Sequence, residues 1–148
     1  VMPFGDCALD ISSRLSRDMP LLCLAREIGA HSGEHGHGTN GTACIQSLGS
    51  QKVDRVVFLS DMQMYGHKYG DSHFGVAIED YRRQVNRDVW LHSVDLASYG
   101  TPAVPPGKNV NLIAGFSEQI LNLIAMAEGI GQEQSKCVPS LEYVRKNF

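Results

Sequence analysis

The chain has 148 residues, the length of one ordinary domain, with 43% hydrophobic and 20% charged residues. This composition allows a packed core and argues against wholesale disorder. The net charge of −3 excludes a domain-wide basic field, so charge alone predicts no strong nonspecific binding to nucleic acid. No apolar run reaches the ~20 residues that cross a bilayer, and we expect a cytoplasmic protein without membrane contact. Because the chain opens on Val1 and lacks a starting Met, we expect it to be part of a longer protein.

The four cysteines are scattered along the chain and form no C-x-x-C pair. A disulfide framework is therefore not predicted, because small disulfide-rich scaffolds carry a much higher density of cysteine. Cys23 and Cys44 sit among apolar residues, a pattern typical of buried free thiols.

The sequence of the N-terminal third of the chain predicts a hairpin and two helices. Residues 1–5 read as a short strand, with 8–12 as its antiparallel partner. Asp18 is expected to cap a helix, in which apolar residues recur at helical spacing: Leu21, Leu24, Ala25 and Ile28. Asn40 is expected to cap a second helix over residues 41–48, which Gly49 ends.

Strands and helices alternate in the rest of the chain. The stretch VDRVVFLS (53–60) is nearly continuously apolar, which is typical of a parallel strand covered on both faces. A helix with an inner stripe of Phe74, Ala77, Ile78, Tyr81 and Val85 follows. Strands are predicted over 89–94 and 110–114. Ser117 is expected to cap a last core helix with its inner face made by Ile120, Leu121, Ile124 and Ala127.

This order predicts an α/β fold of three layers, with a mostly parallel central sheet and helices on both faces. We expect one domain over residues 1–129, and a C-terminal tail over 130–148 with a short helix near 138–144. Parallel sheets place their ligand sites at the carboxyl ends of the strands. Here the loops at those ends begin with Asp61 and Asp95.

Two oxygen-bearing residues form the first candidate site. Asp61 directly follows an apolar strand and can be a ligand for a hard cation, a general base, or a carboxylate that caps its own loop. Thr39 stands at the entrance to a helix in G-T-N-G-T, where its hydroxyl can coordinate Mg²⁺. The alternative for this segment is ordinary helix capping by Thr39 or Asn40.

The stretch HSGEHGHG forms the second candidate site. His31, Glu34, His35 and His37 are ligand types that Zn²⁺ takes. The stretch contains no H-E-x-x-H and no paired cysteines, and its glycines make the loop costly to order around a metal. We therefore expect a solvated loop at this place.

The loop from residue 61 to 72 mixes aromatic side chains with cationic or titratable ones. Tyr65, His67 and Lys68 could stack on and pair with single-stranded RNA, or the loop could pack on itself. Nucleophilic catalysis has little support, since the chain has no G-x-S-x-G elbow and no phosphate-binding P-loop.

Several stretches resemble the von Willebrand factor A domain, and most closely the A domain of Ro (TROVE) proteins. VDRVVFLSDMQMYG is similar to the strand and metal loop of that domain, and HGTNGTA to its Thr loop. Further likeness lies in Asp80–Arg83, in Gly115–Ser117 before an apolar helix, and in the Pro/Gly-rich loop of VWLHSVDLASYGTPAVPPGKNV. The resemblance covers roughly residues 1 to 127.

The resemblance implies a metal-ion-dependent adhesion site (MIDAS) in which Thr39 and Asp61 hold Mg²⁺ or another hard divalent cation. Asn40 departs from the Asp that Ro-like sequences tend to have there. The first motif of the site, D-x-S-x-S, is absent, and Asp10-Ile-Ser12 does not replace it. In the family that motif ends the first, central strand, so this strand is expected from the same protein outside the chain or from another chain.

The resemblance further implies a non-catalytic binding module that belongs to a small-RNA-binding protein of the Ro type. Partners would be small noncoding RNA or an acidic protein ligand, with candidate contacts at His37, Asn40, Tyr65, His67 and Lys68. Two alternatives stay open. One is a protein-binding A domain without an RNA role, and the other is a metal hydrolase that uses the histidine cluster with Asp61.

Overall fold

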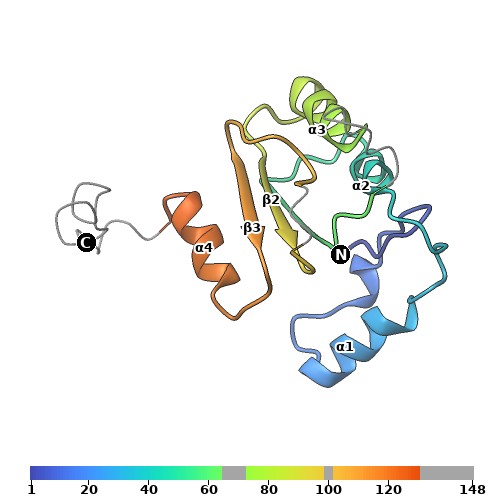
Figure 1. The fold of residues 1–148 in the computed structure, drawn as a ribbon. Helices are drawn as coiled ribbons and strands as arrows, with labels where there is room; N and C mark the ends of the chain where they lie inside the picture. The colour runs from blue at the N-terminus through green and yellow to red at the C-terminus, as the bar shows by residue number, and fades with distance from the viewer. Residues whose placement is uncertain (65–72, 99–101, 131–148) are drawn as a thin grey trace, which may run out of the picture. The chain divides into compact units, whose positions relative to one another are not determined.

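The computed structural model describes residues 1–64, 73–98 and 102–130 (Figure 1). The chain divides into two units, Val1–Phe116 and Ser117–Phe148, which we describe separately. The predicted contact residues Tyr65, His67 and Lys68 and the predicted tail helix lie outside the described residues. No helix in the described part of the chain is both long and apolar enough to span a membrane.

A parallel three-stranded sheet lies at the centre of the first unit. Its strands are β1 (Arg55–Ser60), β2 (Trp90–Asp95) and β3 (Val110–Ala114), in the order β1-β2-β3. Both pairings are parallel, with Phe58 opposite Ser93 and Val94 opposite Ile113. The predicted α/β fold with a parallel sheet flanked by helices is confirmed, and each predicted strand of the sheet is present within two residues of its expected bounds.

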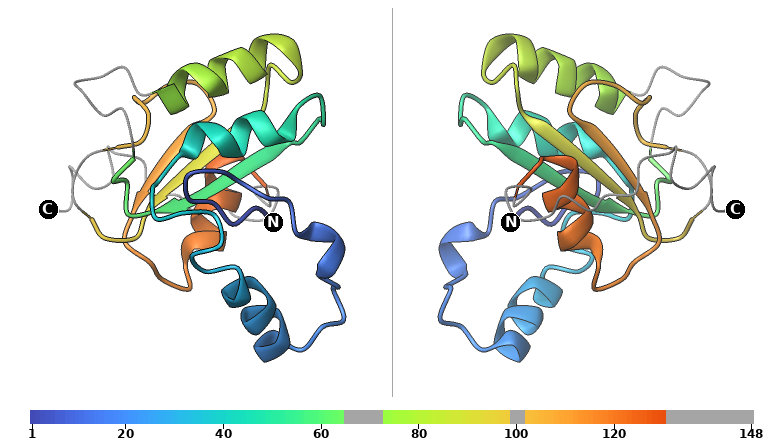
Figure 2. Two further views of the ribbon diagram at one scale, coloured as in Figure 1. Left: turned by 90° about the vertical axis from the view of Figure 1, so that its right-hand side faces the viewer. Right: turned by 90° about the vertical axis from the view of Figure 1, so that its left-hand side faces the viewer.

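Helices α2 (Gly41–Leu48) and α3 (His73–Gln84) pack together on one face of this sheet (Figure 2). The ring of Phe58 in β1 stacks on Phe4 at 5.1 Å between centroids and meets Phe74 of α3 at 4.5 Å. The predicted stripe of α3 is buried at Phe74, Ile78 and Tyr81. The aromatic and aliphatic contacts across β1, α2 and α3 form the core of the first unit.

Strand β1 is less covered than the sequence predicts. Its side chains at Val56, Phe58 and Ser60 face the core, but Val57 and Leu59 are 43% and 44% exposed. Strand β1 also ends the sheet, and no described strand pairs with its other edge. The central strand β2 has the burial on both faces that was expected of β1, with Leu91, His92, Ser93 and Val94 all buried.

The N-terminal segment turns back on itself as predicted, but without two regular strands. The amides of Leu9 and Ile11 donate to the carbonyls of Pro3 and Val1, one antiparallel bridge joins Phe4 and Ala8, and a short 3₁₀ helix follows at Ser12–Arg14. The backbone groups of Gly5 and Asp6 bond instead to a distant loop. The amide of Asp6 donates to the carbonyl of His35, and the amide of Asn40 donates to the carbonyl of Gly5.

Helix α1 (Leu21–Ala30) differs from its prediction in cap and in burial. Pro20 occupies the N-cap position without a side-chain hydrogen bond, so Asp18 is not the cap. No residue of α1 is buried, and Leu21 and Leu22 are 78% and 76% exposed. The apolar spacing thus predicted the helix correctly, but not a core contact. Cys23 is exposed with it, contrary to the expected buried thiol.

Helix α4 (Ile120–Ala127) lies in the second unit, and the expected single domain over residues 1–129 stays a prediction. Gln119 is its N-cap, because Ser117 instead closes a turn in which its hydroxyl accepts from the amide of Gln119. Ile120 and Ile124 are buried as expected, but Leu121 is 75% exposed and Ala127 is exposed. The buried face of α4 is therefore narrower than the four-residue face predicted from the sequence.

Candidate functional site

The N-terminus of α2 separates the roles of Thr39 and Asn40. The Asn40 side chain caps the helix by accepting from the amide of Ala43 at 3.3 Å, and its own amide group donates to the carbonyl of Asp6 at 3.0 Å. Thr39 is half-buried, and its hydroxyl has no hydrogen-bond partner among the described residues. Because Asn40 does the capping, the hydroxyl of Thr39 is available to a ligand.

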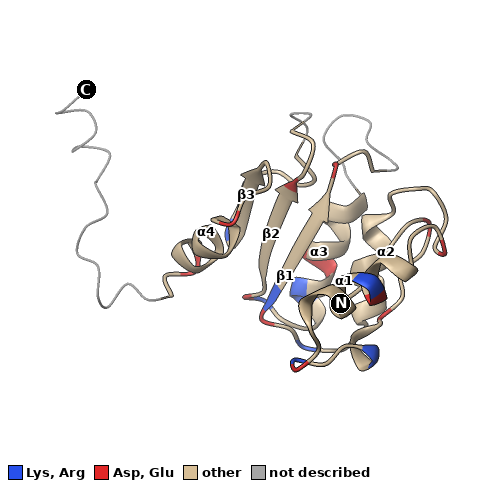
Figure 3. Cartoon of the chain, turned by 90° about the horizontal axis from the view of Figure 1, so that it is seen from below, with Lys and Arg blue, Asp and Glu red and all other residues tan. Residues whose placement is uncertain are grey.

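Two carboxylates mark the carboxyl ends of β1 and β2. Asp61 follows β1, and one of its oxygens, Oδ1, accepts from the amide of Gln63 at 3.1 Å. Asp95 ends β2 at the acidic tip seen in Figure 3, and its Oδ1 accepts from the amides of Ala97 and Ser98. Each Asp therefore orders the start of its own loop. For Asp61 this leaves the second carboxylate oxygen for another contact.

The packing of Gly41 places the first residue of α2 against side chains of β1, of the loop after it and of α3. A β-carbon at this glycine would lie 3.0 Å from the Phe58 ring, 2.9 Å from Phe74 and 2.8 Å from the Met64 sulfur. Phe58 and Met64 each stand three residues from Asp61, and Gly41 stands two residues after Thr39. Gly41 therefore packs tightly against side chains that precede and follow Asp61 in the sequence. The approach of Thr39 to Asp61 and the binding of Mg²⁺ by the pair stay predictions.

The histidine-rich stretch is not the solvated loop that was expected. His31 is only 5% exposed, and it lies with Glu34 and His35 in a turn after α1. One ligand atom from each of these three lies within 4.8 Å of those of the other two. The turn is ordered because its carbonyl at His35 accepts hydrogen bonds from the Gly5–Cys7 segment, a contact that no local sequence pattern predicts.

The two other predicted contact residues that the structure describes, His37 and Asn40, lie in different surroundings. His37 is exposed and is not part of the three-residue cluster. Asn40 would have to break its two hydrogen bonds inside the protein to contact a partner through its side chain. Both assignments stay predictions. The residues that sequence reasoning missed are Cys7 and Arg14, which contact the two histidines from the opening segment, far away in sequence.

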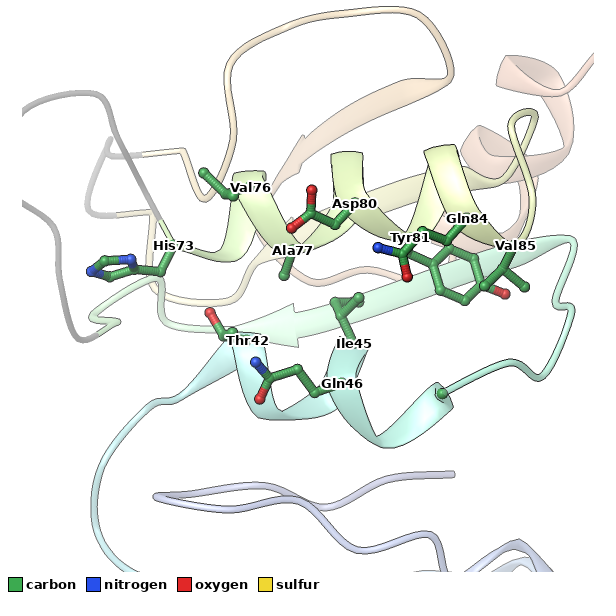
Figure 4. A pocket seen from close by; sticks show the side chains of 11 residues that line it. Thr42, Ile45, Gln46, His73, Val76, Ala77, Asp80, Tyr81, Gln84 and Val85 are labelled. Atoms are coloured by element: carbon green, nitrogen blue, oxygen red, sulfur yellow. The ribbon is translucent and has the colours of Figure 1, made fainter.

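Two grooves border α3. The first, of about 500 Å³, lies between α2 and α3 and presents Thr42, Gln46, His73, Asp80 and Gln84 (Figure 4). The second, of about 930 Å³, lies between α3 and the proline-rich loop and is lined by four cations: Arg82, Arg83, Arg87 and Lys108. Leu91 and Val110 near the amino ends of their strands also line it, so this groove is at the opposite end of the sheet from Asp61.

Fold and site together define an α/β protein with a parallel sheet and an oxygen-rich strand end. Among solved structures, the chain is similar to the crystal structure of the Ro (RSR) protein from Deinococcus radiodurans, with a TM-score of 0.62 and 19% sequence identity. The match covers 86% of this chain and 25% of that one, so the chain spans about a quarter of the length of that protein. No protein-family model and no curated protein matches the sequence. At this identity the similarity shows the fold.

Proposed function

We propose that this chain is a non-catalytic binding module of the Ro type, which holds a hard divalent cation with Thr39 and Asp61 and takes small noncoding RNA as partner. The observation that carries the proposal is the hydroxyl of Thr39, half-buried before α2 and without a hydrogen-bond partner among the described residues, in a chain with the fold of a Ro protein. Capping, the alternative role for this hydroxyl, is filled by Asn40.

The chemistry of the donors fits Mg²⁺. A hydroxyl and a carboxylate supply the oxygen ligands that this ion prefers, while water fills the other positions. Two side chains alone bind weakly, so an acidic group of the partner would raise the affinity by taking one position. An RNA phosphate and a protein carboxylate both meet this requirement.

Phosphate contacts away from the cation would come from the basic groove beside α3. Its cations are partly offset, because Arg82 pairs with Glu79 at 2.7 Å, Lys108 with Asp88 at 3.1 Å, and Arg83 with Asp80. Such partial compensation favours a modest affinity that depends on salt over strong nonspecific binding, in keeping with the net charge of −3.

Fluorescence anisotropy with labelled single-stranded RNA, with and without Mg²⁺, tests this function. We expect saturable binding that Mg²⁺ strengthens, and loss of the Mg²⁺-dependent part in Thr39→Ala and Asp61→Asn. The double variant Arg83→Glu/Arg87→Glu should weaken binding at both Mg²⁺ levels. Arg17→Glu/Arg26→Glu makes the same charge change outside the groove and should bind more tightly than the groove variant.

Absence of binding in all conditions would remove RNA from the proposal. If an acidic peptide then bound in a Mg²⁺-dependent way, the chain would be a protein-binding A domain. The hydrolase alternative lacks support in the described residues, because neither His37 nor Asp61 joins the cluster of His31, Glu34 and His35.

A further inference from the structure

His31, Glu34 and His35 converge in the turn that follows α1. Nδ1 of His31 lies 2.7 Å from Oε2 of Glu34, and the two imidazole rings stack with centroids 6.1 Å apart. Their spacing, H-x-x-E-H, is that of one class of zinc-enzyme motif. Here the residues lie on a turn between Gly33 and Gly36, which have φ angles of +81° and +85°.

Burial gives the cluster a second and independent mark of a ligand site. The side chain of His31 is only 4% exposed. Nε2 of His35 is buried and has no hydrogen-bond partner among the described residues. A buried nitrogen without a partner is unfavourable, and a bound ion is one of the few things that relieve it.

The neighbours of the two rings decide which nitrogens can bind. Nδ1 of His35 faces the thiol of Cys7, with 3.9 Å between nitrogen and sulfur, so Nε2 is the nitrogen left for a ligand. Arg14 lies 3.2 Å from Nε2 of His31, and because arginine only donates, that nitrogen must accept. Nδ1 of His31 then carries the ring proton and donates to Glu34 in the metal-free protein. To bind an ion, Nδ1 must give up this proton and Nε2 must take one, so the contact with Arg14 opens when the metal binds.

We propose that His31, Glu34 and His35 bind one Zn²⁺ ion, with water in the fourth position. Two imidazole nitrogens and a carboxylate oxygen are ligands that this ion takes, whereas Mg²⁺ selects oxygen alone. The site is thus separate in chemistry from Thr39 and Asp61. Cys7, which faces Nδ1 of His35, holds that ring in position, the role that outer-shell partners play at zinc sites.

The ion would fasten the opening segment to the loop that leads into α2. The amides of Asp6 and Cys7 already donate to the carbonyl of His35, and Asn40 donates to Gly5. Zinc on His31 and His35 would fix the turn to which that segment is bonded. We therefore expect Zn²⁺ to raise the melting temperature, because it binds the folded state selectively.

Competition with a chromophoric chelator, together with elemental analysis of the 148-residue chain, tests this site. One equivalent of Zn²⁺ should bind. His35→Ala and Glu34→Gln should weaken Zn²⁺ binding by more than the roughly 10–100-fold that loss of an outer-shell partner costs. His73→Ala, which removes an exposed histidine on α3, should bind Zn²⁺ as the parent chain does. Equal affinity in the parent chain, His35→Ala and Glu34→Gln would overturn the proposal.

Three further measurements separate the loss of a zinc ligand from other causes of weaker Zn²⁺ binding. Circular dichroism of Glu34→Gln, which preserves the shape of the side chain, separates loss of a ligand from loss of the fold. Zinc binding should persist in Thr39→Ala and Asp61→Asn, which makes the outcome independent of the Mg²⁺ proposal. It should also persist in His37→Ala, and its loss there would overturn the three-residue assignment.

Discussion

At the scale of single residues, burial decides which thiol reacts. Burial raises the pKa of Cys44 to about 11 from its ordinary value of 9.0, whereas Cys7 and Cys23 are exposed. The thiolate is the reactive form, so at pH 8 we expect iodoacetamide to modify Cys7 and Cys23 long before Cys44. Peptide mass mapping over time would measure the three rates. Equal rates in the native protein, with no difference from the urea-unfolded chain, would contradict this burial.

The candidate site was only partly predictable at this scale. The sequence identified Thr39 and Asp61 as oxygen donors at helix and strand ends, but it left capping open between Thr39 and Asn40. The structure assigns capping to Asn40. The burial of His31 could not be predicted, because its neighbour Arg14 lies 17 positions away, across α1. The H-x-x-E-H spacing was the one local signal that pointed to this cluster.

At the scale of elements, α2 packs so closely on β1 that a larger residue in place of Gly41 should destabilise the fold. A β-carbon would meet Met64, Phe74 and Phe58 at 2.8 to 3.0 Å, so Gly41→Ala should destabilise the fold by about 1–3 kcal/mol. Gly29→Ala is the matched control, since that glycine lies in α1 with nothing within 4 Å of an added β-carbon. It should stabilise by about 0.5–1 kcal/mol. Urea unfolding would measure both, and equal effects would refute the packing.

Substitutions in the neighbouring strands β1 and β2 should lower the free energy of unfolding by different amounts. Leu91 in β2 is 0% exposed, so Leu91→Ala should lower the free energy of unfolding by about 2–5 kcal/mol. Leu59 in β1 is 44% exposed, so Leu59→Ala should lower it by about 1 kcal/mol or less. A large loss for Leu59→Ala in this chain would mean that something covers this face of β1.

Elements were predictable where one local pattern dominates. The cap at Asn40, the stripe of α3 and the short strand β3 all matched the structure, because each depends on neighbours a few residues away. At the N-terminus the sequence predicted the antiparallel return of residues 8–12 on 1–5, but not the bonds that Gly5 and Asp6 make with residues 35–40. For α1, the periodicity of the apolar residues predicted the helix correctly. It could not predict whether another part of the protein covers the apolar side of that helix.

At the scale of the whole molecule, one edge of β1 has no partner strand among the described residues. This unpaired edge distinguishes the proposed binding module from a self-contained domain. Parallel strands are normally covered on both faces and paired on both edges, but β1 is half-exposed and pairs only with β2 in the described part of the chain. The expectation that a strand from elsewhere completes the sheet remains a prediction. The match to the similar Ro structure covers 25% of that chain.

Binding of a hard cation by Thr39 and Asp61 is the central claim, and nuclear magnetic resonance tests it most directly. During a Mg²⁺ titration of the ¹⁵N-labelled chain, amide signals of residues 39–41 and 60–63 should shift together with one Kd. Traces of Mn²⁺ should broaden the same signals first. Both effects should vanish in Asp61→Asn and persist in His35→Ala. Shifts absent from these residues, or unchanged in Asp61→Asn, would contradict the account.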